Sequence, residues 1–206
     1  LHLSLRRQRQ MCIRDRTIGS LMLKITAAEF AKIVSGQLHE ISESTMIDQV
    51  PVINSKNATK NSFFVAFKGE QVDGHNFVSE AINLGAKFAL VSKPVAEPHV
   101  LVADTGKALI DLAIYLRSKL PELKIIGITG SQGKTTTKEF LNSILKLEGE
   151  TVATAGNFNT DIGVPLTLLR CNEQTKFCIL EMGARHPGDI AKLTKIAKPN
   201  VGVVLV

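Results

Sequence analysis

We predict an α/β protein in which a small N-terminal α/β domain precedes a truncated domain with a mostly parallel sheet. Along most of the chain, short aliphatic and β-branched segments alternate with segments of helical periodicity, which is the pattern of βαβ units. A glycine-rich loop at residues 129–135 joins one such strand to the next helix. Hydrophobic residues make up 44% of the chain, enough to bury a core. No apolar run approaches the roughly 20 residues of a membrane span.

The start of the chain carries most of its positive charge. Residues 1–20 hold five arginines and one aspartate, a balance of +4, so the remainder accounts for only about +2 of the formal net charge of +6. This segment has no helix caps and no apolar core of a secretory signal. We interpret residues 1–21 as a non-native or disordered leader, with Met22 as the candidate start; a basic nucleic-acid arm is the alternative. Without this segment, the charge gives no reason to expect a nucleic-acid partner.

Residues 22–103 are predicted to form the first domain. Thr26 and Glu29 make a capping-box pattern ahead of a short helix. A second helix is expected at residues 78–84, before Gly85. Strands are expected at residues 50–53, 63–67, 87–92 and 99–102.

A connecting helix is predicted at residues 104–122. Asp104 is a suitable N-cap and Pro121 ends the helix. A continuous apolar stripe follows helical spacing and predicts burial on one face. Its members are Leu109, Leu112, Ala113, Leu116 and Leu120.

Residues 123–206 are predicted to form the second domain. Helices are expected at residues 134–147, 161–169 and 187–197, the last with Pro187 in its first turn. The strands between them are expected at residues 124–129, 151–154, 177–182 and 201–206. In the first helix, the side chains expected to face inward are Phe140, Leu141, Ile144 and Leu145. The chain stops within what we expect to be a buried strand, which indicates truncation.

Residues 129–135 read TGSQGKT and form a candidate phosphate-binding loop, or P-loop. Small residues between a strand and a helix leave backbone N–H groups free to bind an anion at the positive end of the helix dipole. Lys134 supplies a charge for the β and γ phosphates, and the Thr135 hydroxyl can bind Mg²⁺. The chain fits G-x-x-G-K-T but has Ile128 where the longer G-x-x-x-x-G-K-[ST] pattern needs glycine. A glycine turn beside a surface lysine is the alternative. The residues expected to contact ATP are Thr129, Gly130, Ser131, Gln132, Gly133, Lys134, Thr135 and Thr136.

A magnesium ion that bridges nucleotide phosphates needs a carboxylate as well. Glu181 ends the predicted strand at residues 177–182, at the edge where open α/β sheets bind ligands. A solvated strand end is the alternative. We interpret His186 as a residue at a helix N-terminus rather than a metal ligand. Cys171 and Cys178 are expected to be packing residues; the three cysteines have no CxxC spacing, which favours a reducing cytoplasm.

Three segments resemble the Mur ligase family. Residues 127–139 read GITGSQGKTTTKE, residues 156–169 read GNFNTDIGVPLTLL, and residues 180–184 read LEMGA. They follow the order and spacing of the family, and the resemblance covers residues 22–206. The three segments are most similar to the family members that join D-alanyl-D-alanine to UDP-MurNAc-tripeptide.

The resemblance implies an ATP-dependent amide ligase of peptidoglycan precursor synthesis that works through an acyl phosphate. It implies Lys134 and Glu181 as catalytic residues, with Thr135 and Glu181 as Mg²⁺ ligands. As a bare loop residue, His75 would be an ordinary surface histidine. The implied substrate contacts are Ser55, Lys68, Gly69, Asp73, Gly74, His75, Asn157 and Asn159. The family usually has Asp-Ser-Arg at residues 54–56, where this chain has Asn-Ser-Lys, so the uridine-side contacts are in question because lysine lacks the bidentate geometry of arginine.

In the family, a metal-binding histidine and a carbamylated lysine follow the glutamate, and by spacing both would lie beyond Val206. The 206-residue piece is therefore expected not to ligate alone, whereas the full-length enzyme is expected to be a cytoplasmic monomer without a membrane span. The nearest rival is another Mur-type ligase or a folylpolyglutamate ligase. A non-catalytic nucleotide-binding module and a generic P-loop NTPase are further alternatives, the last disfavoured by the domain before the loop.

Overall fold

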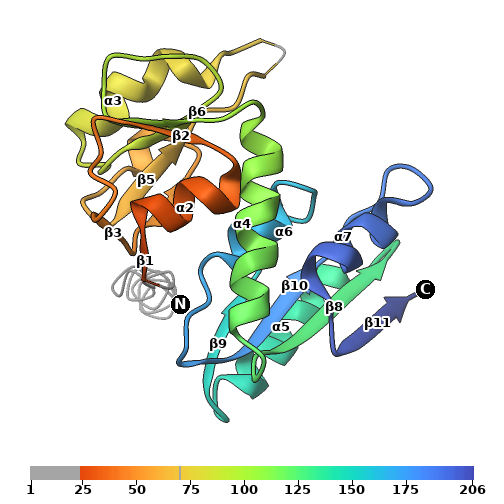
Figure 1. Ribbon diagram of the computed structural model, residues 1–206. Helices are drawn as coiled ribbons and strands as arrows, with labels where there is room; N and C mark the ends of the chain where they lie inside the picture. Colours follow the sequence, from red (N-terminus) through yellow and green to blue (C-terminus); the bar gives the residue numbers. More distant parts are fainter. Residues whose placement is uncertain (1–23, 70) are drawn as a thin grey trace, which may run out of the picture.

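The computed structural model describes residues 24–69 and 71–206 and confirms the predicted α/β fold (Figure 1). The predicted leader at residues 1–21 lies outside the described residues, as does Cys12. The described strands form three sheets: a two-stranded β1–β3 pair, a five-stranded sheet, and a four-stranded sheet. Within the described ranges, no helix combines the length and apolar character that crossing a membrane requires.

The five-stranded sheet has the order β2-β7-β6-β5-β4, parallel except for β2. Its strands are β2 (Gln37–His39), β4 (Val50–Val52), β5 (Ser62–Val65), β6 (Ala89–Val91) and β7 (His99–Leu101). The accompanying elements are β1 (Ile25–Thr26), β3 (Met46–Ile47), α2 (Ala27–Val34), α3 (Val78–Asn83) and the 3₁₀ turns η1 (Ser55–Asn57) and η2 (Gly74–Phe77). The sequence analysis did not predict β1, β2 and β3: β1 and β3 have only two residues each, and β2 contains a single apolar residue, Leu38.

The capping pattern in the sequence predicted the start of the first helix correctly. The Thr26 hydroxyl accepts a hydrogen bond from the Glu29 backbone N–H at 3.1 Å, so the predicted capping residue begins α2. Ser35, in the left-handed conformation, ends the helix. Gly85, with a φ of 116°, likewise follows α3 as predicted.

Helix α4 (Thr105–Lys119) links the two larger sheets. The Asp104 side chain caps it by accepting the N–H groups of Gly106 and Lys107 at 2.7 and 3.0 Å. All five residues of the predicted apolar stripe are buried. The helix packs against α2 on one side and against α6 and α7 on the other. A single hydrophobic core therefore continues through α4 from one sheet to the other.

Phe30 is the central aromatic residue of the first sheet's core. Its ring is fully buried and meets Phe63 and Phe88 edge-to-face, with ring centroids 5.6 and 5.5 Å apart. We expect Phe30→Ala to lower the free energy of unfolding by about 3–5 kcal/mol, because it leaves a cavity and removes both aromatic contacts. Urea unfolding measures this loss. Phe77→Ala, at a residue 40% exposed, is the control and should cost clearly less; equal losses would contradict the assignment.

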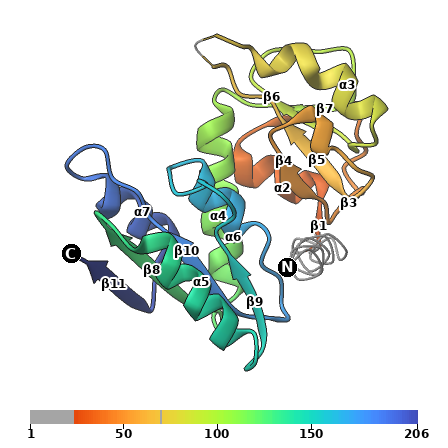
Figure 2. The same cartoon turned by 180° about the vertical axis from the view of Figure 1, so that it is seen from behind.

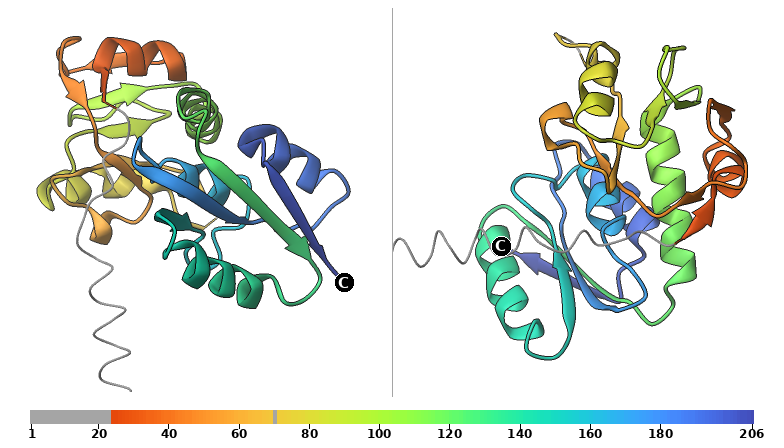
Figure 3. Two further views of the ribbon diagram at one scale, coloured as in Figure 1. Left: turned by 90° about the horizontal axis from the view of Figure 1, so that it is seen from below. Right: turned by 90° about the vertical axis from the view of Figure 1, so that its left-hand side faces the viewer.

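The four-stranded sheet is entirely parallel, with the order β11-β8-β10-β9. Its strands are β8 (Lys124–Gly130), β9 (Glu150–Ala153), β10 (Thr175–Glu181) and β11 (Val201–Leu205). Helix α5 (Lys134–Leu145) covers one face, whereas α6 (Gly163–Leu168) and α7 (Asp189–Ala197) lie with α4 on the other (Figures 2 and 3). This arrangement confirms the predicted alternation of strands and helices.

Two details of the prediction for this sheet were wrong. Phe140 and Ile144 do not face inward but are 66% and 58% exposed, because α5 turns the stripe that contains Lys138 toward the sheet. Pro187 precedes the last helix rather than lying in its first turn, because α7 begins at Asp189.

Candidate functional site

The glycine-rich loop connects the end of β8 to the start of α5. Gly130 has a φ of 142°, and a Cβ there would lie 2.3 Å from the backbone oxygen of Leu205, so only glycine fits. Gly133, with a φ of 76°, is the N-cap of α5. Ile128 is fully buried in β8. The position that lacks the glycine of the longer pattern therefore belongs to the strand and not to the loop.

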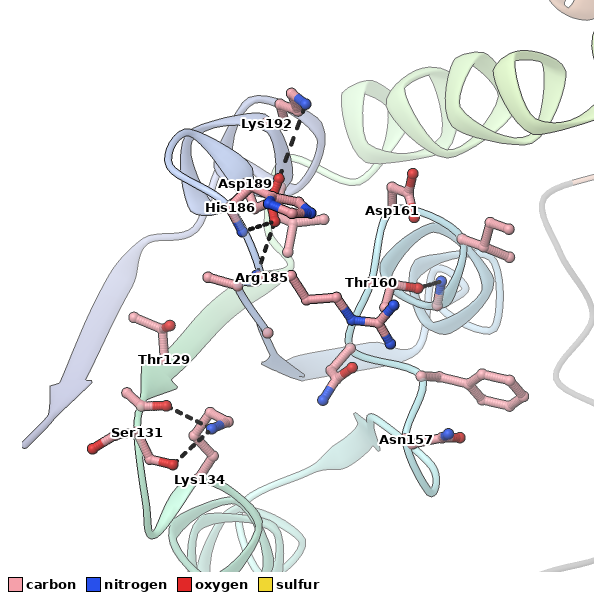
Figure 4. Close-up of a pocket in the computed structure, with 18 of the residues that line it drawn as sticks. Thr129, Ser131, Lys134, Asn157, Thr160, Asp161, Arg185, His186, Asp189 and Lys192 are labelled. Atoms are coloured by element: carbon pink, nitrogen blue, oxygen red, sulfur yellow. Dashed lines mark hydrogen bonds and ion pairs between the residues drawn. The ribbon is translucent and has the colours of Figure 1, made fainter.

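Lys134 lies over this loop at the first turn of α5. Its ammonium donates to the backbone oxygen of Gly130 at 2.5 Å and makes a longer contact of 3.5 Å with the oxygen of Ser131 (Figure 4). A positive charge thus lies next to the backbone N–H groups of the helix start, and both attract an anion. This geometry agrees with the phosphate contact expected from the sequence.

Glu181 is the centre of the polar cluster behind the loop. Its side chain is almost fully buried and accepts two hydrogen bonds, from the Thr135 hydroxyl at 3.0 Å and from the Asn159 amide at 3.2 Å. The parallel register pairs Glu181 with Ile128, so the carboxylate lies beside the start of the loop. Three residues predicted separately from the sequence are therefore in direct contact.

The backbone of Glu181 is also fixed. Its N–H donates to the Thr154 hydroxyl at 2.9 Å, at the end of β9. The backbone oxygen of Thr154 in turn accepts from the buried ammonium of Lys138 at 2.9 Å. Lys138, on α5, thereby connects the loop helix to the strand end that orients the carboxylate. The sequence analysis did not single out this lysine.

The cluster fits Mg²⁺ better than a soft metal. Its ligand atoms would be a carboxylate oxygen of Glu181 and the Thr135 hydroxyl, which are the hard ligands that magnesium prefers. No group of three or more His, Cys, Asp and Glu residues gathers anywhere in the described ranges. This combination suits an ion that takes its remaining ligands from phosphates and water.

A cleft of about 1280 Å³ opens from the loop. It extends from the P-loop to the segment before α6 and to the turn before α7, and it also touches Ile53 of the first sheet's unit. Asn157 and Asn159 both line it. The other polar side chains on its walls are Thr129, Ser131, Lys134, Thr160, Asp161, Arg185, His186, Asp189 and Lys192.

A close backbone approach positions the Asn157–Asn159 segment. A Cβ on Gly163 would lie 2.2 Å from the Phe158 backbone, so this segment can cross the start of α6 only because residue 163 is glycine. The Asn159 backbone oxygen also accepts the Gly183 N–H at 2.8 Å. The sequence did not predict the charged residues Asp161, Arg185, Asp189 and Lys192 as site residues, although the last three follow the end of β10, where such sheets bind ligands.

The candidate substrate residues of the first domain lie outside this cleft. The Ser55 hydroxyl is buried and donates to the Glu80 carboxylate at 2.5 Å. Lys68 and Asp73 face each other across a short antiparallel bridge. The structure brings Lys68, Gly69, Asp73, Gly74 and His75 together in one turn region, and Ser55 belongs to a separate one.

His75 is buried, so the alternative of an ordinary surface histidine is wrong. Its Nε2 accepts the Ser92 backbone N–H at 2.9 Å, so the ring proton is on Nδ1, which donates to Asp73 at 2.6 Å. Both ring nitrogens are therefore occupied by protein groups. The ring holds the turn at residues 73–77 against the end of β6, and a direct substrate contact stays a prediction.

Asp73 makes this segment sensitive to acid. Hydrogen bonds from Lys93, from the His75 backbone and from the His75 ring hold the pKa of Asp73 well below its ordinary value of about 3.9. A carboxyl group with a lowered pKa in the folded state stabilises the fold above its unfolded pKa, and this contribution is lost as pH falls.

We therefore expect Asp73→Asn to destabilise the protein at pH 7, with the difference from the unmutated chain shrinking below about pH 4. Urea unfolding over a pH series measures it. Asp161→Asn removes a carboxylate that has no hydrogen bond or ion pair with any described residue, and it should show no such trend. A constant difference for Asp73→Asn at all pH values would contradict this account.

Cys171 and Cys178 are both free and fully buried. A hydrogen bond with Cys178, together with burial, raises the pKa of the Cys171 thiol well above its usual range. The thiol therefore stays protonated, which agrees with the predicted packing role.

Comparison with known proteins identifies the family. The pattern of the "Mur ligase family, catalytic domain" matches residues 52–115, and that of the "Mur ligase middle domain" matches residues 128–206. The UDP-N-acetylmuramoyl-tripeptide–D-alanyl-D-alanine ligases of Escherichia coli K12 and Bacillus subtilis 168 are both 37% identical to the chain, over 185 and 191 residues. Each alignment covers 89% of this chain and 40% or 41% of the relative, so the chain spans about two fifths of the length of these curated relatives.

Solved structures agree with the sequence relatives. Crystal structure I of MurF from Acinetobacter baumannii has a TM-score of 0.79 and 37% identity, covering 89% of this chain and 41% of that one. The MurF ligase from Thermotoga maritima, in complex with ADP, has a TM-score of 0.65 and 39% identity, covering 76% of this chain and 37% of that one. The two family patterns together span most of the described fold, and the chain belongs to the Mur ligase family.

Proposed function

We propose that this protein acts as an ATP-dependent ligase that joins D-alanyl-D-alanine to UDP-MurNAc-tripeptide in peptidoglycan precursor synthesis. The observation that carries the proposal is the contact of Thr135 and Asn159 with the buried carboxylate of Glu181, directly behind the P-loop. The 37% identity to relatives named for this reaction supports the choice of substrates. The same proposal includes a cytoplasmic location and a monomeric full-length enzyme. It also includes the domain limits at residues 22–103, 104–122 and 123–206.

The nucleotide site would be formed by residues 129–136. The backbone N–H groups of the loop and Lys134 would hold the β and γ phosphates. Thr135 and Glu181 would hold Mg²⁺, which when bound supplies charge neutralisation at the phosphates. The relative from Thermotoga maritima that is named as an ADP complex supports a nucleotide at this site.

The proposed reaction has two steps. A carboxylate oxygen of the tripeptide attacks the γ-phosphorus, and the bond from that phosphorus to the β–γ bridging oxygen breaks, which gives an acyl phosphate and ADP. The amine of D-alanyl-D-alanine then attacks the acyl carbon, loses a proton, and displaces phosphate. Lys134 would stabilise the charge on the transferred phosphoryl group, and Asn157 would orient a substrate oxygen.

The first domain would hold the UDP-muramoyl part of the substrate. The residues proposed to contact it are Ser55, Lys68, Gly69, Asp73, Gly74 and His75. Ser55 would have to exchange its hydrogen bond with Glu80 for one to the ligand. His75 would have to exchange one of its hydrogen bonds, with Asp73 or Ser92, for one to the ligand, because both of its ring nitrogens already have protein partners.

A binding screen tests the substrate assignment. UDP-MurNAc-tripeptide, UDP-MurNAc-dipeptide and folate would each be titrated into the protein with ADP and Mg²⁺ present. We expect the tripeptide nucleotide to bind most tightly. Preference for the dipeptide nucleotide or for folate would support another Mur-type or a folylpolyglutamate ligase. Binding of ADP alone would support a nucleotide-binding module without ligase activity.

A further inference from the structure

Arg185 is an exposed residue on the wall of the cleft, and its positive charge has no protein partner in the described ranges. Its guanidinium makes no hydrogen bond or ion pair with any described residue. Figure 4 shows the side chain extending from the end of β10 toward the segment that carries Asn157 and Thr160. An arginine that lines a cleft without a protein partner can offer all five of its N–H donors to a ligand.

The backbone that carries Arg185 is fixed, although its side chain is free. One carboxylate oxygen of Asp189 accepts the backbone N–H groups of both Arg185 and His186, at 3.0 and 2.9 Å. These two hydrogen bonds hold the pKa of Asp189 below its ordinary value, so the carboxylate is ionised at neutral pH. Asp189 is thereby used to fix the turn, and it does not neutralise the guanidinium.

The two lysines of the cleft already have interaction partners. Lys134 lies over the P-loop, where it faces nucleotide phosphates. Lys192 forms an ion pair with Asp189, at 4.0 Å. Arg185 is therefore the cation available on the wall that faces the P-loop across the cleft, within the described ranges.

A cation at this place would assist the proposed reaction. A carboxylate and a γ-phosphate repel each other, and the attack brings them into contact. A guanidinium can bind a carboxylate through two parallel hydrogen bonds, which both orients the nucleophile and offsets the repulsion. The cleft also reaches Ile53 of the first unit, so a substrate that spans both units would enter it from that side.

We propose that Arg185 binds the attacking carboxylate of the acyl substrate and holds it against the γ-phosphate. This inference rests on the proposed function, and it adds a substrate-binding residue that the sequence did not predict. It assigns Asp189 as the positioning residue for Arg185.

Calorimetric titrations of the 206-residue protein test the proposal with three ligands. These are ADP with Mg²⁺, then inorganic phosphate added to the ADP-loaded protein, and UDP-MurNAc-tripeptide. We expect Arg185→Ala to weaken the tripeptide nucleotide about 10- to 100-fold, because a charge-assisted hydrogen-bond pair is lost. ADP affinity should change by less than about twofold, because the nucleotide lies on the opposite wall. Arg185→Lys should recover only part of the loss, since lysine keeps the charge but not the bidentate geometry.

Two matched variants provide controls. Arg170→Ala removes an arginine outside the cleft and should leave all three affinities unchanged. Asp161→Asn removes the other acid on the cleft wall; a loss equal to that of Arg185→Ala would mean that the two residues act as an internal pair, and would overturn the proposal. Thermal unfolding of each variant separates a binding loss from a folding defect.

The outcomes separate this proposal from the proposed function. Unchanged binding of the tripeptide nucleotide in Arg185→Ala would overturn it, as would an equal loss of ADP. A loss confined to inorganic phosphate would assign Arg185 to the transferred phosphate and overturn the carboxylate assignment. If the unmutated protein bound ADP but no tripeptide nucleotide, the proposed function would fail. The titration with inorganic phosphate would then decide whether Arg185 binds an anion.

Discussion

Lys134→Ala is expected to weaken the binding of ATP about 10- to 100-fold and to reduce turnover of the complete ligase to less than a tenth. The ammonium lies 2.5 Å from the Gly130 backbone oxygen, so it is held at the mouth of the loop rather than extended into solvent. Alanine removes the only side-chain charge of the segment from residue 129 to residue 136. The backbone N–H groups remain, and for this reason we expect residual binding of nucleotide.

Titration of the nucleotide measures the binding loss, and phosphate release measures turnover. Lys195→Ala, which removes an exposed lysine of α7 outside the cleft, is the matched control and should leave both quantities unchanged. Lys134→Arg keeps the charge and should retain part of the affinity. Turnover above a tenth of the unmutated rate in Lys134→Ala would sink the assignment of this loop.

Glu181→Gln is expected to remove the benefit of Mg²⁺ and to lower turnover on the order of 100-fold. Glutamine has nearly the same shape and can still hydrogen-bond to Thr135 and Asn159, but it lacks the charge that a magnesium ligand supplies. The carboxylate is only 4% exposed, so few other groups can replace it.

ADP affinity with Mg²⁺ and with a chelator, compared between the two proteins, measures this effect. In the unmutated protein, Mg²⁺ should increase ADP affinity, whereas in Glu181→Gln the two affinities should be nearly equal. Glu173→Gln, at an exposed acid outside the cleft, serves as the control. An undiminished Mg²⁺ effect in Glu181→Gln would falsify its role as a metal ligand.

The sequence predicted well those features that depend on neighbouring residues. Thr26 and Asp104 cap their helices as expected, because a cap involves residues only two or three positions apart. The apolar stripe of α4 is buried along its full length, since an amphipathic period indicates the inward face directly.

Periodicity did not predict which face of a helix is buried where the helix has two apolar stripes, and it did not predict the order of the strands. In α5, Phe140 and Ile144 follow helical spacing as well as Leu141 and Leu145 do, and only packing on the sheet selects the inward set. In the four-stranded sheet, the sequence pattern did not predict that β10 lies between β8 and β9. Sequence patterns do not specify strand order, because hydrogen bonds between strands join distant residues.

The sequence by itself predicted residues 129–135 as a phosphate-binding loop, because such a loop uses contiguous backbone N–H groups. The glycines at 130 and 133 agree with this prediction, since both have a positive φ in the structure. Only the tertiary structure showed which of the predicted side chains are in contact behind that loop. Glu181 meets Asn159 and Thr135 since parallel strands bring their carboxyl ends to one edge. The Arg185 guanidinium has no partner among the described residues, because the Asp189 carboxylate accepts backbone N–H groups instead. A local sequence pattern does not show which partner a charged group will have.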